Sequence, residues 1–208
     1  RYAADFKNAL IWERRALELN PLQPINHLDL GYLYYSMRQC KESIAEHDAT
    51  LKADPGQGLA YGGLAIALLC VGDIKGAHAA VDKYAKLAPG DPLMIDAEIR
   101  VAVAENRLDD ARNLVATLKS RAEKGDQLYY FIAQEECLLR DYAAAAQSIR
   151  RAVAAHDWNF AGDYLWYVPE DWPDDPRIQA ALGQPELKAM WETRRKNLAA
   201  FPREGTTN

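Results

Sequence analysis

Small residues recur along the chain at a fixed interval of 34 positions, each inside an apolar stretch with helical spacing. They are Ala9, Ser43, Ala77, Ala111 and Ala145. Prolines at the same interval, Pro21, Pro55 and Pro89, close the first three stretches, since proline cannot continue a helix interior. A fixed period of this length is typical of stacked helical repeats, because one unit cannot bury its apolar face alone. The pattern therefore predicts an all-α fold of antiparallel helix pairs.

The second unit carries the pattern most completely. It reads His27-x-x-Leu30-Gly31-x-x-Tyr34, then Ser43-x-x-x-His47, then Thr50 and Pro55. This is similar to the tetratricopeptide repeat, whose pattern is W-x2-L-G-x2-Y, then A-x3-F, then P. The resemblance covers roughly residues 1–157, although His27 replaces the tryptophan, and Glu13 and His47 replace the aromatic residue. It implies a right-handed superhelical solenoid of antiparallel helix pairs.

The period divides the chain into a half unit and four full units. The half unit, 1–21, has only its second helix, over about residues 2–19, and the full units are expected at about 24–55, 58–89, 92–123 and 126–157. The last two units have Glu123 and Asp157 where the earlier units have proline. The partner of the first helix would lie before Arg1, so we expect a fragment of a longer protein. The alternative is a native start with a lone capping helix.

The period ends after Asp157. Pro169, Pro173 and Pro176 prevent a long helix there, and a short stretch over 176–182 precedes a helix that begins at Pro185. The apolar residues of that last helix recur at helical spacing: Leu187, Met190, Trp191 and Leu198. We therefore expect an irregular, aromatic and proline-rich segment with C-terminal capping helices over 158–201, and a flexible tail over 202–208.

Composition narrows the possible partners. The chain has 208 residues, 49% of them hydrophobic, and a net charge of −5 with a pI near 5.4. An acidic folded chain is not expected to bind nucleic acid directly. The basic run over 194–196 is interpreted as a solvated helix end. The sequence contains no stretch of about 18 uncharged apolar residues, so no membrane span is predicted.

The cysteines predict a reducing compartment. Cys40, Cys70 and Cys137 are odd in number and widely spaced, with neither metal-ligand nor redox spacing. This argues against a disulfide framework and favours the cytoplasm.

Candidate chemistry is sparse. Gly56-x-Gly58 follows Asp54-Pro55 rather than a strand, so an inter-repeat turn explains it better than dinucleotide binding. His27 and His47 take positions of large packing residues, and we expect them to contact each other. Asp109-Asp110 and Glu135-Glu136 are interpreted as solvated surface, although Glu136 replaces an inward-facing aromatic residue and needs a partner. We expect no catalytic residue, metal site or cofactor, and hence no enzyme.

The resemblance points instead to a peptide-binding groove lined by the first helices of the units. Carried onto this chain, the partner-binding residues are Leu28, Tyr32, Tyr35, Ile66, Leu69, Asp96, Arg100, Val103, Tyr130 and Gln134. The lining is apolar and aromatic, with Asp96 and Arg100 as isolated charges. The set of basic and amide residues that clamps chaperone tails in this family is absent. Alternatively, the aromatic run 163–168 and Trp172 fill the groove internally.

These residues are consistent with two functions. The first is a non-catalytic scaffold that binds a peptide or partner helix in the groove. The second is a regulatory or oligomerising region of a larger signalling enzyme or transcription regulator. Residues 172–178 resemble the ends of repeat arrays in bacterial class III adenylate cyclases and winged-helix regulators. The sequence leaves the ligand and the oligomeric state open.

Overall fold

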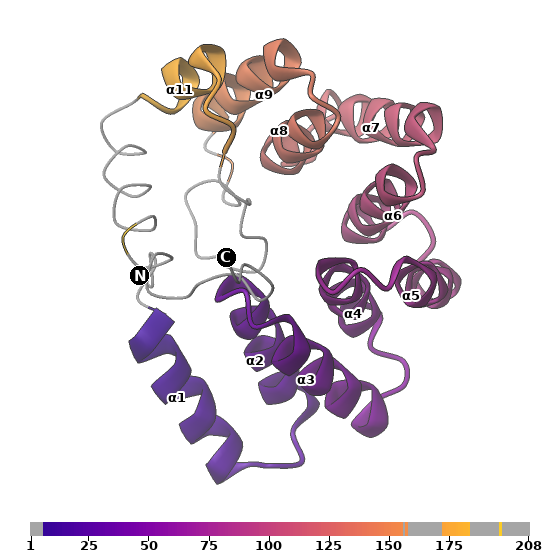
Figure 1. Cartoon of the computed structure of the whole chain (residues 1–208), viewed down its shortest axis with the longest axis vertical. Helices are drawn as coiled ribbons and strands as arrows, with labels where there is room; N and C mark the ends of the chain where they lie inside the picture. Colours follow the sequence, from indigo (N-terminus) through magenta and orange to yellow (C-terminus); the bar gives the residue numbers. More distant parts are fainter. Residues whose placement is uncertain (1–5, 156, 158–171, 184–195, 197–208) are drawn as a thin grey trace, which may run out of the picture.

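The protein is an all-α stack of helix pairs in the computed structural model, which describes residues 6–155, 157, 172–183 and 196 (Figure 1). The described part contains helices and no strand. The helices are α1 (Phe6–Leu19), α2 (Pro24–Ser36), α3 (Cys40–Ala53), α4 (Gly58–Cys70), α5 (Ile74–Leu87), α6 (Pro92–Ala104), α7 (Leu108–Ala122), α8 (Tyr129–Leu138), α9 (Tyr142–Ala154) and α11 (Pro176–Leu182). The all-α prediction is confirmed.

Consecutive helices pack as pairs, α2 on α3, α4 on α5, α6 on α7 and α8 on α9. The pairs form a curved stack in which α2, α4, α6 and α8 contact one another in series along the inner side (Figure 1). The small residues lie where the helices touch: Ser43, Ala77, Ala111 and Ala145 have no exposed surface, and Ala9 is 8% exposed. At the end of the described stack, α11 packs on α9 through the buried Ile178 and Leu182. The helix expected from Pro185 lies outside the described residues.

The 34-residue period also appears in the backbone conformation. The turn within each helix pair contains one residue with positive φ, at Arg38 (63°), Gly72 (82°), Asn106 (60°) and Arg140 (61°). Of these four, only glycine adopts this conformation without steric cost. The residue that follows occupies the N-cap position of the next helix, where the side chains of Asp73 and Asp141 accept the N–H groups of Gly76 and Ala144. The turns thus keep their geometry while their sequences differ.

His47, on α3, occupies the centre of the junction between the α2–α3 pair and the α4–α5 pair. Its imidazole has no exposed surface, and burial lowers its pKa to about 3, so the ring is neutral. The ring packs edge-on against Tyr32, with centroids 4.8 Å apart. It fits only because glycines face it: a Cβ built on Gly31 would lie 2.8 Å from His47 Cε1, and one on Gly63 would come closer still.

The expected contact between the two histidines is not formed. His27 Nδ1 lies 2.6 Å from Glu46 Oε2, and its Nε2 lies 3.3 Å from the Pro21 carbonyl oxygen. His27 therefore ties the start of α2 to α3 at the surface, whereas His47 points into the helix junction.

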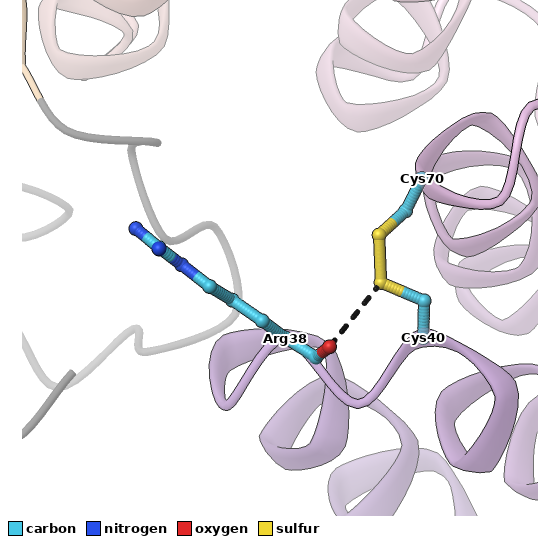
Figure 2. Close-up of a disulfide and its surroundings, with 3 residues drawn as sticks. All are labelled: Arg38, Cys40 and Cys70. Carbon is cyan, nitrogen blue, oxygen red and sulfur yellow. Dashed lines mark hydrogen bonds between the residues drawn. A yellow bond between two sulfur atoms is a disulfide. The ribbon is translucent and has the colours of Figure 1, made fainter. Parts of the chain in front are cut away.

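A disulfide joins Cys40 and Cys70, contrary to the expectation from the cysteine count (Figure 2). Cys40 begins α3 and Cys70 ends α4, and their Cα atoms lie 6.2 Å apart. The stack brings the start of one outer helix beside the end of the next inner helix, although 30 positions separate them in sequence. The third cysteine, Cys137, remains a thiol whose pKa is raised to about 12 by burial. The odd count was therefore a wrong argument for a reducing compartment, because one pair and one thiol also give three.

Candidate functional site

The residues predicted to line a groove come together on the inner helices. Leu28, Tyr32 and Tyr35 lie on α2, Ile66 and Leu69 on α4, Asp96, Arg100 and Val103 on α6, and Tyr130 and Gln134 on α8. Most of these side chains are buried, while Leu69, Arg100 and Val103 are partly exposed. We refer to the ten residues as the inner face.

The aromatic residues of the inner face are engaged within the chain. The Tyr32 hydroxyl donates a hydrogen bond of 2.7 Å to the Leu59 carbonyl oxygen, which fixes α2 against the start of α4. Tyr130 packs edge-on against Trp172, with centroids 6.5 Å apart. Leu28, Tyr32 and Tyr130 belong to the same hydrophobic core cluster as Trp172. Of the aromatic segment expected to fill the groove, only Trp172 lies within the described residues, because 163–168 do not.

The charges of the inner face form a buried cluster, contrary to the expectation of isolated charges. Arg100 Nε lies 3.2 Å from Asp96 Oδ2, and its Nη2 lies 2.6 Å from Glu135 Oε1 and 3.3 Å from Gln134 Oε1. Asp96 and Glu135 have no exposed surface. The two carboxylates raise the pKa of Arg100 against the opposing effect of burial, so the guanidinium keeps its charge. Asp96 and Arg100 are one helical turn apart, and this spacing was the signal for the pair.

The adjacent carboxylates Glu135 and Glu136 are both buried, so the expectation of solvated surface was wrong for them. Glu136 has the partners that its position required. Its Oε1 pairs with Lys119 Nζ at 2.5 Å, and its Oε2 accepts a hydrogen bond of 2.7 Å from Ser148. The corresponding positions one unit earlier are the buried Val101 and Ala102. Acidic residues at apolar phases of the repeat therefore marked buried ion pairs.

A pocket of about 410 Å³ lies between α7 and the turn that joins α8 to α9. We call it the α7–α8 pocket; its lining is Arg112, Val115, Ala116, Lys119, Glu136, Leu139, Arg140 and Asp141. The helix α8 begins at Tyr129, three residues later than the period from Pro92 predicts. At this first turn of α8, the side chain of buried Asp157 accepts the Tyr130 N–H at 3.1 Å. Asp157 takes the position where earlier units have proline. No sequence motif marks the residues that line this pocket.

Within the described residues, no cluster of three His, Cys, Asp or Glu side chains is placed to hold a metal ion. No helix in this part of the chain is long and apolar enough to cross a membrane.

Comparison with known proteins identifies the architecture. No family model matches the chain. Among solved structures, the chain is similar to a tetratricopeptide repeat protein from Parabacteroides merdae ATCC 43184, with a TM-score of 0.58 and 14% sequence identity, over 96% of this chain and 73% of that one. A match to the APC/C hetero-tetramer Cut9–Hcn1 covers 96% of this chain but 47% of that one, with a TM-score of 0.38 and 16% identity. The chain therefore has the fold of tetratricopeptide repeat proteins.

Proposed function

We propose that the chain is a non-catalytic scaffold that binds a peptide or a helix of a partner protein along the inner face. The observation that carries this proposal is the curved stack itself (Figure 1). Its inner helices have apolar and aromatic side chains. Rigid aromatic side chains supply large contact areas at low entropic cost, and apolar grooves suit amphipathic helices.

The burial of the inner face determines how a partner would engage it. Leu69 and Val103 are partly exposed, so a partner would contact them first. Tyr130 is covered by Trp172, so a partner that reached Tyr130 would have to displace the indole. The proposed ligand is therefore an apolar segment that competes with the chain's own contacts.

The test is capture of a partner from a lysate of the source organism, with the bound proteins identified by mass spectrometry. Leu69→Glu and Val103→Glu place a charge on the inner face at positions that tolerate solvent. Leu87→Glu is the matched control, because Leu87 is 47% exposed at the end of the outer helix α5. We expect a partner on wild type and Leu87→Glu that is lost from both inner-face variants. Identical partners on all four baits, with helicity confirmed by circular dichroism, would refute the proposed surface.

A second candidate is the regulatory or oligomerising region of a larger signalling enzyme or transcription regulator, with the inner face packed internally. The contact of Trp172 with Tyr130 favours it. Trp172→Ala separates the two candidates. Greater partner capture by the variant supports the scaffold, in which Trp172 is a competitor. A loss of about 3–5 kcal/mol of unfolding free energy with no change in capture supports internal packing.

A further inference from the structure

The α7–α8 pocket combines three cations with two carboxylates, in a chain whose net charge is −5. Lys119, Arg112 and Arg140 supply the cations, and Glu136 and Asp141 the carboxylates. The pocket therefore has a net charge of +1. Its volume, about 410 Å³, is within the range that holds a small ligand or a peptide side chain.

Both carboxylates of the pocket are already engaged. Glu136, at 3% side-chain exposure, pairs with Lys119 and accepts a hydrogen bond from Ser148. Asp141 accepts the Ala144 N–H at 3.1 Å and caps the start of α9. Neither carboxylate bonds a guanidinium of the pocket within the described structure.

The two arginines are the cations that remain available. Arg112 pairs with Asp109 at 2.7 Å, but the side chains of the two residues are 57% and 94% exposed, and such surface pairs contribute little. Arg140 is exposed, and within the described part of the chain its guanidinium has no hydrogen bond or ion pair. Its backbone has φ 61°, at the phase where the preceding units have Arg38, Gly72 and Asn106, all with positive φ.

We infer that the α7–α8 pocket binds a carboxylate of an acidic partner peptide through Arg112 and Arg140. Guanidinium groups bind carboxylates with paired, charge-assisted hydrogen bonds. A singly charged carboxylate balances the net charge of +1, whereas a dianionic phosphate would leave the pocket with a net charge of −1. Val115, Ala116 and Leu139 give the pocket an apolar wall for the aliphatic part of the ligand. This site lies on α7 and the α8–α9 turn, apart from the inner face.

The inference rests on the proposed function as a scaffold, and its test is independent of any natural partner. The probe is the peptide acetyl-Ala-Leu-Glu-Glu-Leu-Ala-amide, titrated into ¹⁵N-labelled protein while the amides of Leu139–Asp141 and the arginine Nε–H groups are followed by NMR. The controls are the same peptide with glutamines, and one with phosphoserines in place of the glutamates. The pocket variants are Arg112→Gln and Arg140→Gln. Arg15→Gln is the matched control, because Arg15 on α1 is about as exposed as Arg112 and also forms a surface pair with an acidic residue three positions away, Glu18.

We expect saturable shifts with the glutamate peptide and at least about tenfold weaker binding to each pocket variant. Arg15→Gln should bind as wild type does, and the glutamine peptide should not bind. Shifts that are absent, or equal in all variants, would overturn the inference. Binding of the phosphoserine peptide alone would overturn the carboxylate assignment. A natural partner retained by both pocket variants would refute the pocket while leaving the scaffold intact, whereas no partner on wild type would count against the scaffold.

Discussion

The effect of Gly63→Ala on stability should depend on the residue at position 47, with opposite signs for histidine and alanine. In the native chain the new methyl group would overlap the His47 imidazole, which also packs on Tyr32 and has no room to move. Overpacking of this kind costs about 1–3 kcal/mol of unfolding free energy. Alanine in place of glycine inside α4 recovers about 0.5–1 kcal/mol of that, because the unfolded chain loses freedom. The net expectation is a destabilisation of about 1–2 kcal/mol.

In a His47→Ala background the overlap is gone and only the helix effect remains. Gly63→Ala should then stabilise the protein by about 0.5–1 kcal/mol. The double-mutant cycle thus has an expected coupling energy of about 2 kcal/mol. Gly31→Ala should behave in the same way, since its Cβ would also meet the ring.

Urea unfolding followed by circular dichroism measures these differences, provided that the slopes with urea stay constant. Gly62→Ala is the internal control. It lies beside Gly63 on α4, but its Cβ would meet Tyr84 rather than His47, so its effect should be the same in both backgrounds. A destabilisation by Gly63→Ala that does not depend on His47 would refute the packing argument.

Three further predictions concern pH, redox state and turn geometry. Because the pKa of His47 is lowered to about 3 in the folded chain, the neutral ring's contribution is complete above about pH 6.5 and is lost as the pH falls towards 3, by about 1.4 kcal/mol per unit; subtracting the pH profile of His47→Gln should isolate this slope. Reduction of the Cys40–Cys70 disulfide should cost about 3–4 kcal/mol, because it opens a loop of about 30 residues, and the thiol count under denaturing conditions should rise from one to three. Gly72→Ala should destabilise, and Arg140→Gly should stabilise, by about 1 kcal/mol each in thermal unfolding, because both residues have positive φ. Arg140→Gly should at the same time lose the peptide response of the α7–α8 pocket. An increase of both the stability and the peptide response in this variant would contradict the inferred role of Arg140.

The features that sequence reasoning predicted are those the period controls. The small residue of each unit must lie between two helices whichever partner it meets, so Ala77 and Ala111 could be placed without coordinates. The period also placed His47 at a packing position, but the fit depends on glycines of two different helices. Periodicity alone could not predict this contact of His47 with Gly31 and Gly63.

The features that it missed depend on neighbouring units rather than on one unit. Cys40 and Cys70 meet because one unit stacks on the next, and a count of cysteines holds no information on stacking. Glu135 is buried because Arg100 of the preceding unit reaches it. Reading each unusual residue against the same phase of the adjacent unit would have found both the carboxylate and its cation. The α7–α8 pocket likewise depends on two units, because α7 of one unit and the α8–α9 turn of the next line it.

The position of the disulfide has a consequence for how the stack comes apart. In an array where each unit contacts only its neighbours, stability is a sum of units and the couplings between them. A covalent link between α3 and α4 makes two adjacent pairs open as one block, with a coupling that no local fluctuation can break. The junction between α7 and α8 has no such link and contains a pocket. Sub-global opening should therefore begin beyond α6, and amide hydrogen exchange should be faster in α8 and α9 than in α3 and α4.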